Sequence, residues 1–391
     1  MMLCSFVALI CLLLIAYSYL VFPWLMRRAA RKTKTETEPL EEFPTLSVLM
    51  AVHNEERVLE KKIRSIFRSR YPKQKLEVWV GSDASSDQTD EILTQLSAEF
   101  PQLNWKPFGR RTGKPAIVNA LAAHASGEIL VVTDADALFN DLTLAEMVLP
   151  FTDPAVGAVQ ACADAIPEAG GDVGAQERAY TRREMLLKEG ESAYGAVIGG
   201  FGAAYALRKV LFRPVPPSFV VDDFFTFADL LNRGFQTRFS PAARVMLGLS
   251  SDSRVQFRRK RRIGRGNFQN LWHFRRMWLG ERGVRIAWLF WSHKGIRWVT
   301  PLLLLLFMVC AGLSPWNSFN RLLALTLAAF VLLAAMDILL ARLNIHLRPI
   351  RYLRHFLWMN LALLAGMWDA LAMKNANGIW DNQKPTDSPA L

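Results

Sequence analysis

The sequence predicts an α/β domain with a mostly parallel sheet, accompanied by α-helices that cross a membrane. One observation predicts the sheet, because short apolar segments alternate with segments of helical spacing. A second indicates where its ligand would lie, because two of the apolar segments end in aspartate. A third predicts the membrane part, because nearly uncharged stretches approach the length of about 20 residues that a spanning helix needs. Hydrophobic residues make up 51% of the 391 positions and mean hydropathy is +0.14, as expected for a mixed protein. The apolar stretches are residues 3–25, 298–316, 322–341 and 356–373.

A basic cluster after the first apolar stretch predicts the orientation. Residues 27–34 contain five positive residues and no acid, and cytoplasmic loops carry such an excess. We therefore expect the region between the first two spans to be cytoplasmic, with both chain ends outside. A cleaved signal peptide has a basic start and a shorter apolar run. The first stretch is interpreted as an anchor, and the chain as an integral protein of a bacterial inner membrane.

These patterns divide the chain into six segments. The net charge of +12 is concentrated near the predicted spans, which favours membrane lipids rather than nucleic acid as its partner. The segments are an N-terminal transmembrane helix (1–26), a basic juxtamembrane linker (27–45), the α/β domain (46–255), basic interfacial helices (256–297), three transmembrane helices (298–373) and a polar tail (374–391).

Within the α/β domain, each element follows from its pattern. The strands are short, apolar and rich in β-branched residues. The first helix has Val58, Ile63 and Ile66 on one face, the second has an expected N-cap near Ser86, and the third opens with proline. The expected strands are residues 45–52, 76–83 and 128–136, and the expected helices are 55–70, 86–100 and 114–125.

Acidic residues mark the ends of two expected strands. Asp83 ends one, and Asp134 and Asp136 end another. Ligands of open sheets lie beyond the carboxyl ends of the strands. Two neighbouring carboxylates repel each other unless positive charge is close, and Mg²⁺ or Mn²⁺ bound to phosphate oxygens would supply it. The alternative for the Asp134–Asp136 segment is a polar turn that caps the next helix.

A second acidic pair, Asp222 and Asp223, precedes a segment of helical spacing. One interpretation is an N-cap in favourable contact with the helix dipole. The other is a general base that deprotonates an acceptor hydroxyl. The sequence leaves both open.

Two basic segments have two interpretations each. Residues 108–120, which include Lys114, form a glycine-containing basic loop that suits phosphate at a helix start, or an ordinary solvated loop. Residues 256–278 hold six positive residues between Arg258 and Arg265. That segment is expected to lie in the membrane interface as a tryptophan-bearing amphipathic helix, or to bind a diphosphate through one or two arginines.

Two aspartates, Asp337 and Asp369, fall within the apolar stretches. Acids inside a membrane are functional candidates by default. Both lie near the ends of the predicted spans, where water is within reach, so we interpret them as ordinary polar positions.

Four segments together resemble the membrane-integrated family 2 glycosyltransferases of the polysaccharide synthase type. They are residues 47–66, 78–92, 113–139 and 220–239, in the family's order and spacing. The resemblance implies a GT-A (Rossmann-like) catalytic domain, a nucleotide-diphosphate sugar such as a UDP-hexose or UDP-N-acetylhexosamine, Mg²⁺ or Mn²⁺, and inversion at the anomeric carbon. The implied acceptor is a growing polysaccharide or glycan at the cytoplasmic face.

The resemblance also implies roles for residues at matching positions. Asp83 would contact the uracil or ribose, and Asp134 would lie at the nucleotide. Asp136 would bind the metal, Lys114 would approach the donor, and Asp223 would be the catalytic base.

The acceptor side and the diphosphate side follow in the same way. Gly200, Phe201, Gly202 and Asp222 would line the acceptor site, and Arg262 would meet the diphosphate. Two departures stand out. The family's processive enzymes carry Gln-x-x-Arg-Trp where this chain reads Arg-Lys-Arg-Arg-Ile, so a stacking platform for the acceptor sugar is missing. The acidic pair is Asp-Asp rather than the commoner Glu-Asp, which keeps the carboxylate.

Two other functions remain open at this point. The missing tryptophan favours transfer of one sugar to a lipid, such as a polyprenyl phosphate or a diacylglycerol- or ceramide-like acceptor. A protein of another class, a non-catalytic membrane binding subunit, would also keep the fold. The presence of Asp83, Asp136 and Asp223 argues against that last possibility.

Overall fold

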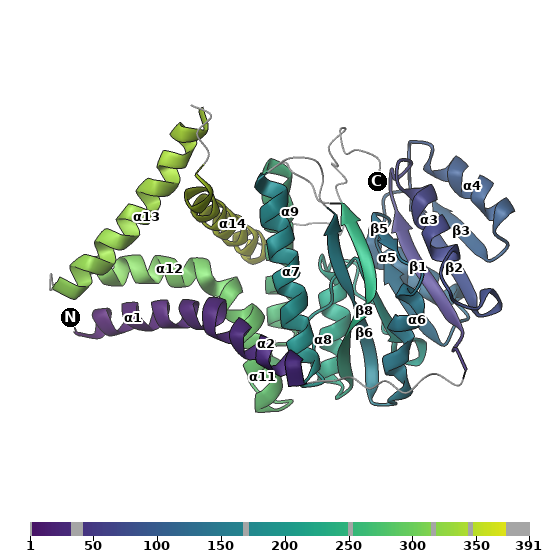
Figure 1. The fold of residues 1–391 in the computed structure, drawn as a ribbon, viewed down its shortest axis with the longest axis horizontal. Helices are drawn as coiled ribbons and strands as arrows, with labels where there is room; N and C mark the ends of the chain where they lie inside the picture. The colour runs from purple at the N-terminus through teal and green to yellow at the C-terminus, as the bar shows by residue number, and fades with distance from the viewer. Residues whose placement is uncertain are drawn as a thin grey trace.

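The protein consists of a sheet domain and a group of apolar helices that extend away from it (Figure 1). The polar tail predicted at residues 374–391 lies outside the described part of the chain, as do residues 33–41 of the predicted basic linker. The computed structural model describes residues 2–32, 42–166, 172–248, 253–313, 318–342 and 347–372.

An eight-stranded sheet forms the centre of the domain, in the order β3-β2-β1-β4-β7-β6-β8-β5. The pairs β1–β2, β1–β4, β2–β3 and β6–β8 are parallel, and β7 is antiparallel to both β4 and β6, as β5 is to β8. The sheet is therefore mixed. Its strands are β1 (Leu46–Val52), β2 (Leu76–Asp83), β3 (Leu103–Phe108), β4 (Ile129–Thr133), β5 (Ala137–Phe139), β6 (Val156–Ile166), β7 (Ala204–Arg208) and β8 (Gln236–Gly248).

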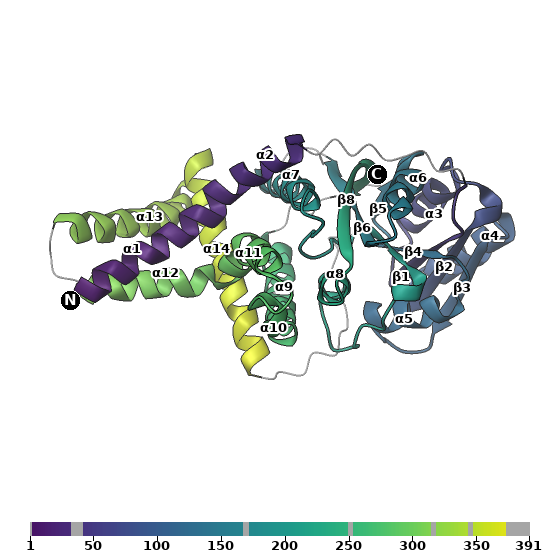
Figure 2. The same cartoon turned by 90° about the horizontal axis from the view of Figure 1, so that it is seen from below.

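The helices form two groups, one against the sheet and one in the apolar region (Figures 1 and 2). Short π-helical segments interrupt two of them, at Tyr17–Val21 (η1) and Trp291–Gly295 (η5). The α-helices are α1 (Met2–Ala16), α2 (Phe22–Lys32), α3 (Leu59–Phe67), α4 (Thr89–Glu99), α5 (Lys114–His124), α6 (Thr143–Val148), α7 (Asp172–Ser192), α8 (Asp222–Asn232), α9 (Ser253–His273), α10 (Arg275–Trp278), α11 (Val284–Phe290), α12 (Ile296–Leu313), α13 (Ser318–Arg342) and α14 (Arg348–Leu371).

The first two expected strands are confirmed to within one residue, whereas the third ends at Thr133, so Asp134 and Asp136 lie just after it. The burial of the central strands explains their composition. Every residue of β1 and β4 is buried, so these strands read as apolar runs rather than as alternating patterns. Helix α5 packs closely on β2, because a Cβ added at Gly81 would lie 2.3 Å from the Ile117 side chain.

Two predicted helix starts are wrong. The helix expected from residue 55 begins at Leu59, because Glu55 and Glu56 instead donate their backbone N–H groups to Thr89 and Asp87. The expected cap at Ser86 is also wrong. Helix α4 begins at Thr89, whose N–H donates to Asp87 Oδ1 at 3.0 Å.

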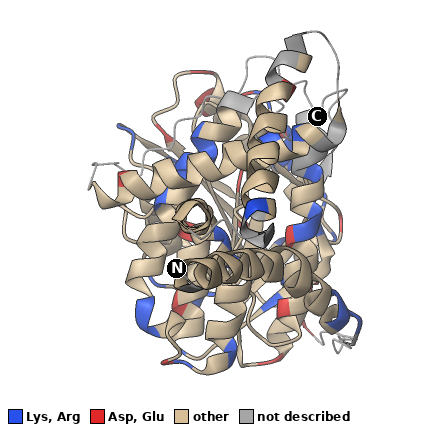
Figure 3. Cartoon of the chain, turned by 90° about the vertical axis from the view of Figure 1, so that its left-hand side faces the viewer, with Lys and Arg blue, Asp and Glu red and all other residues tan. Residues whose placement is uncertain are grey.

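Two helical segments are long and apolar enough to cross a membrane, Leu3–Arg31 and Val284–Leu313. The other two predicted spans are helices α13 and α14, but within the described residues neither meets that measure, and Ala324–Asp337 is a shorter apolar stretch. From the end that carries the N-terminus, the nearest helices display few charged residues (Figure 3). The four-span layout and its orientation remain predictions.

Helix α9 is held against α14 by a close crossing and an ion pair. A Cβ at Gly264 would lie 3.2 Å from the Leu363 backbone, and one at Gly366 would lie 2.2 Å from the Arg261 carbonyl oxygen. Arg261 also donates to both carboxylate oxygens of Asp369, at 2.6 and 2.8 Å. The second acid of the apolar stretches, Asp337, is buried 3.0 Å from Arg354. The contact of Asp369 fits its interpretation as an ordinary polar position, whereas the expected access of Asp337 to water is wrong, because Asp337 is fully buried.

Candidate active site

The tip of β2 holds a buried carboxylate that organises the neighbouring basic loop. Asp83 is fully buried, and its two oxygens accept the backbone N–H groups of Thr112 and Gly113 at 2.5 and 3.0 Å. The Arg111 guanidinium lies 3.3 Å from the same carboxylate. His53 contacts the Asp83 carbonyl oxygen at 2.9 Å. The loop that precedes α5 is therefore fixed to the sheet edge, which contradicts its interpretation as an ordinary solvated loop.

The first residue of α5 places a cation between two of the predicted acids. Lys114 Nζ donates to Asp134 Oδ1 at 2.6 Å and lies 3.8 Å from Asp222 Oδ2. Burial acts to lower the pKa of Lys114, but the charges of Asp134 and Asp222 outweigh it and raise that pKa above its ordinary value. Lys114 is therefore a permanent positive charge at the site. Asp222 is buried, and its Oδ2 accepts no hydrogen bond among the described residues.

Asp223 adjoins this group from the first turn of α8. A Cβ placed on Gly202 would lie 2.9 Å from Asp134 Oδ2, 3.4 Å from Lys114 Nζ and 3.6 Å from Asp223 Oδ2. Three elements thus converge on one glycine. Both Asp222 and Asp223 lie inside the helix start rather than at its N-cap, which is Val221 and makes no side-chain cap hydrogen bond. The N-cap interpretation of the pair is wrong, although the helix dipole still favours their charge.

The surroundings of Asp223 raise its proton affinity. Burial raises the pKa of Asp223 to about 6, and the negative charges of Asp222 and Asp134 add to the rise. The Lys114 cation and the Phe224 N–H, which donates to Asp223 Oδ1 at 2.7 Å, oppose it. Its side chain is only half-buried, so solvent and ligands still reach it. A half-buried carboxylate with a pKa near neutrality is suited to accept a proton.

The acidic segment after β4 rests on a buried lysine. Lys62 is fully buried, donates to Thr133 Oγ1 at 2.9 Å and to the Ala137 carbonyl, and lies 3.4 Å from the centre of the Phe139 ring. Burial holds its pKa well below the ordinary value, whereas the charges of Asp134 and Asp136 act to raise it. Lys62 thus forms hydrogen bonds at both ends of the segment that carries these two acids, at Thr133 and at Ala137.

Helix α9 brings Arg262 within electrostatic range of the same acids. Desolvation lowers the pKa of Arg262, and the positive charge of Arg259 adds to this. The carboxylates of Asp222, Asp134 and Asp223 act in the opposite direction. Arg262 as a whole residue stays exposed to solvent, so its desolvation is partial.

The segment predicted to line the acceptor site lies against Asp223. Gly200 donates its N–H to the Asp223 carbonyl oxygen at 3.4 Å, and Phe201 donates its N–H to Gln160 Oε1 at 2.6 Å. Gly199 has φ of +77°, a conformation that favours glycine. The predicted residues Gly200, Gly202 and Asp222 therefore meet Asp223, and Phe201 is fastened to β6.

The predicted metal ligand, Asp136, follows β4 two residues after Asp134. Among the described residues, no group of three or more His, Cys, Asp or Glu side chains is placed to hold a metal ion. Asp134 and Asp136 offer carboxylate oxygens, the ligand type that Mg²⁺ and Mn²⁺ prefer. Such a site, with few protein ligands, fits a cation whose remaining ligands come from a diphosphate and water.

Sequence reasoning missed Lys62 and a second buried lysine, Lys188. Lys62 stands three residues after Leu59 and four before Ile66, which are both buried, so helical spacing alone places it on the apolar face. Lys188 donates to the Gly199 carbonyl, and burial lowers its pKa to about 8. Its helix has a mixed composition, and no periodic signal separated its buried face.

The chain is similar in sequence to known glycosyltransferases over part of its length. The profile described as glycosyl transferase family 2 matches residues 47–212. A beta-monoglucosyldiacylglycerol synthase from Synechocystis sp. is 35% identical over 120 residues, which are 30% of this chain and 25% of that protein. An N-acetylglucosaminyltransferase from Rhizobium leguminosarum bv. viciae is 23% identical over 272 residues, or 62% of this chain and 61% of its own length. The match to the synthase thus spans only a quarter of that relative.

The fold is also similar to that of a solved glycosyltransferase. The mannosyltransferase PcManGT from Pyrobaculum calidifontis, in complex with GDP-Man and Mn²⁺, superposes with a TM-score of 0.71 at 22% identity. The superposition covers 94% of this chain and 100% of that one, so the likeness extends to the helices beyond the sheet domain. On these grounds the chain carries a glycosyl transferase family 2 domain, in residues 47–212, on a GT-A fold.

Proposed function

We propose that this chain is an inverting glycosyltransferase that moves a sugar from a nucleotide-diphosphate sugar to an acceptor at the cytoplasmic face of a membrane. The observation that carries the proposal is the convergence of Lys114, Asp134 and Asp223 on Gly202. It combines a permanent cation with a carboxylate whose pKa is raised to about 6. The cation stabilises a leaving diphosphate, and the carboxylate accepts the proton of an attacking hydroxyl.

The residues divide the reaction between them. Asp223 accepts the proton of the acceptor hydroxyl as its oxygen attacks the anomeric carbon from the face opposite the leaving group. The bond from that carbon to the diphosphate breaks, and the electron pair leaves with the diphosphate. Lys114 and Arg262 stabilise the negative charge that develops there. Asp83 holds the nucleotide side by fixing the loop before α5.

A divalent cation, Mg²⁺ or Mn²⁺, would be held by Asp136 and assisted by Asp134. When bound, it supplies further positive charge to the diphosphate. The PcManGT structure contains Mn²⁺. The two carboxylates at the end of β4 support a cation at this place, and Lys62 keeps their segment in position.

The donor is proposed to be a UDP-hexose or UDP-N-acetylhexosamine, and the acceptor a growing glycan. A second candidate acceptor is a membrane lipid. Two observations favour it: relatives with 35–36% identity over about a third of this chain are named beta-monoglucosyldiacylglycerol synthase, and Ile263 stands where processive enzymes carry tryptophan. Product size separates the two, because glycan elongation gives long products and lipid transfer adds a single sugar.

The decisive experiment measures nucleotide release by the purified full-length protein in lipid nanodiscs. UDP- and GDP-sugars are supplied one at a time with Mn²⁺ or Mg²⁺ and then with EDTA, in the presence of a membrane lipid extract. We expect release with one donor, its loss with EDTA and recovery when the metal is restored. Sizing and lipase sensitivity of the product identify the acceptor. No release with any donor in the presence of acceptors would contradict the proposal.

The pH dependence of transfer should report Asp223. The carboxylate must be ionised to accept a proton, and its pKa is raised to about 6. We therefore expect kcat/KM to be constant above pH 7 and to fall tenfold per pH unit well below about 6. An acid limb near pH 4, the ordinary carboxyl range, would remove Asp223 from the role of base. Nucleotide affinity measured over the same range controls for loss of donor binding.

Replacing Gly202 by alanine should lower the transfer rate by about tenfold or more, since small displacements of reacting groups are costly. The new Cβ would lie 2.9 Å from Asp134 Oδ2, so the carboxylate or the loop must move. Initial rates of nucleotide release measure the effect. Gly312→Ala is the matched control, because nothing lies within 4 Å of its Cβ position. Equal rates for both variants would show that the site tolerates the added methyl group.

A further inference from the structure

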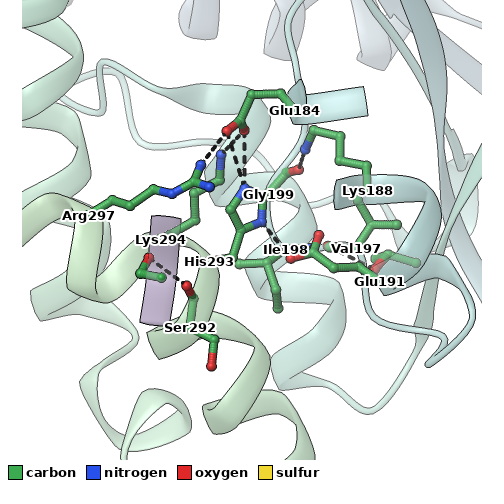
Figure 4. A network of polar contacts seen from close by, with 12 residues as sticks. Glu184, Lys188, Glu191, Val197, Ile198, Gly199, Ser292, His293, Lys294 and Arg297 are labelled. Carbon is green, nitrogen blue, oxygen red and sulfur yellow. Dashed lines mark hydrogen bonds and ion pairs between the residues drawn. The ribbon is translucent and has the colours of Figure 1, made fainter. Parts of the chain in front are cut away.

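A network of buried charged side chains joins the sheet domain to the apolar helix Val284–Leu313 (Figure 4). Helix α7 contributes Glu184 and Glu191. His293 contacts Glu191 Oε1 through Nδ1 at 2.5 Å and Glu184 Oε2 through Nε2 at 3.2 Å. Lys294 and Arg297 also pair with Glu184, at 2.5 and 2.7 Å. Two acids of one element thus bind three basic residues of another.

These groups are buried to a degree that needs a reason. His293 and Glu191 are fully buried, and Glu184 is 3% exposed at its side chain. Burial acts to raise the pKa of Glu184, but Lys294, His293 and Arg297 hold that pKa well below its ordinary value. Replacing such a network by apolar residues is often neutral or stabilising, so its presence is weak evidence of a role in stability. The contacts beyond the network suggest what it does instead.

The network continues into the loop Ile198–Gly200, which contacts the backbone of Asp223. Glu191 Oε2 accepts the N–H of Ile198 at 2.9 Å, and Lys188, one helical turn earlier, donates to the Gly199 carbonyl. The next residue, Gly200, donates its N–H to the Asp223 carbonyl at 3.4 Å. A continuous series of hydrogen bonds and peptide groups therefore connects His293 with the candidate base.

A second, apolar route joins the same two places. Phe224, the residue after Asp223, is 3% exposed and packs against Trp298 of α12 with ring centres 5.1 Å apart. Its ring also fills the space that a side chain at Gly199 would need, since a Cβ there would lie 2.2 Å from Phe224. The apolar helix thus packs directly against the helix turn that carries Asp223, and Phe224 links it to Gly199 of the neighbouring loop.

The segment that carries His293 has an unusual backbone. It is the π-helical segment η5, and π-helical turns within α-helices are often found at functional sites. A second π-helical segment, η1, faces it: Ser18 Oγ donates to the Ser292 carbonyl at 2.8 Å, and Tyr17 Oη lies 3.0 Å from Ser292 Oγ. Both candidate spanning segments therefore depart from regular helix where they meet the network.

We propose that Glu191 and His293 are positioning residues, which fasten the loop Ile198–Gly200, and through it Asp223, to the apolar helix Val284–Leu313. The proposal rests on the proposed function in that Asp223 is taken as the base. It assigns the apolar helix a part in setting the geometry of transfer, in addition to any part in anchoring the chain. Lys188 assists as a second tie to the same loop.

The test compares Glu191→Ala and Glu191→Gln in the full-length protein in nanodiscs. Glutamine keeps an oxygen for the Ile198 N–H and an amide group for His293, whereas alanine loses both. In Glu191→Ala we expect amide hydrogen exchange of residues 196–200 to speed up about tenfold or more. We also expect kcat for transfer to fall about tenfold with donor affinity unchanged. Glu191→Gln should restore both, and Glu189→Ala, on the same helix, should behave as wild type.

The outcomes separate the two proposals. Unchanged exchange in Glu191→Ala, or equal losses in the alanine and glutamine variants, would overturn the positioning role. Faster exchange in a protein whose wild type transfers no sugar would support the tie and count against the proposed function. If Glu191→Ala does not fold, Lys188→Met serves in its place, because it removes the bond to Gly199 and leaves an apolar side chain of similar length. Failure of both variants to fold would make the network structural only and overturn the proposal.

Discussion

Asp223→Asn should fold and bind donor normally but transfer sugar about 10²–10⁴-fold more slowly, which is the usual contribution of a general base. Asparagine keeps the shape of the side chain, and its oxygen still accepts the Phe224 N–H that Asp223 Oδ1 accepts at 2.7 Å. It cannot take up a proton at neutral pH. The loss should therefore fall on kcat, with the donor dissociation constant unchanged.

The measurement is single-turnover transfer in nanodiscs together with nucleotide binding by calorimetry. Asp141→Asn is the matched control, because Asp141 is exposed and belongs to a different part of the domain. Transfer by Asp223→Asn within threefold of wild type would exclude Asp223 as the base. In that case the neighbouring carboxylate Asp222, which is buried 3.8 Å from Lys114, would be the next candidate.

The strands that carry the site could be predicted, because their burial gives them a recognisable apolar composition. Strands β1 and β4 are buried along their whole length and β2 over most of it, which produces apolar runs. Asp83 ends β2, and Asp134 directly follows β4. The second half of the sheet was not predicted strand by strand. Strands β6 and β8 pair with register shifts, and β7 comes after a helix of 21 residues, so the pairing there depends on contacts between distant segments.

The site shows the same division between local and distant signals. The acids at the strand ends could be recognised as candidate site residues, because a carboxylate at that position is seldom needed to stabilise the fold. Lys62 and Lys188 were missed, since lysine in a helix is ordinarily solvated. The spacing of Lys62 from Leu59 and Ile66 could have indicated its burial, whereas only the folded chain shows that Lys188 is buried. The contact between Glu191 and His293 joins residues about a hundred positions apart, and no local sequence pattern predicts it.

Lys114→Met should lower both the free energy of unfolding and the rate of sugar transfer. We expect the loss of stability to be large. Methionine matches the length of the stem but leaves Asp134 and Asp222 facing each other without a cation. Removing one partner of a buried ion pair costs about 3–5 kcal/mol. The 33% exposure of the Asp134 side chain places this case near the lower end. Chemical denaturation of the full-length protein should show the loss.

The pH dependence of this variant distinguishes electrostatics from simple misfolding. Lys114 acts to lower the pKa of Asp223, which stands at about 6 in its presence. Without the cation that pKa rises further, so the acid limb of the remaining activity should move to higher pH. Lys106→Met is the control, because Lys106 is exposed and its removal changes the net charge by the same amount. An unshifted acid limb together with lost stability would mean that Lys114 supports the fold without acting on the base. A shift in Lys114→Met alone would tie the cation of α5 to the proton transfer itself.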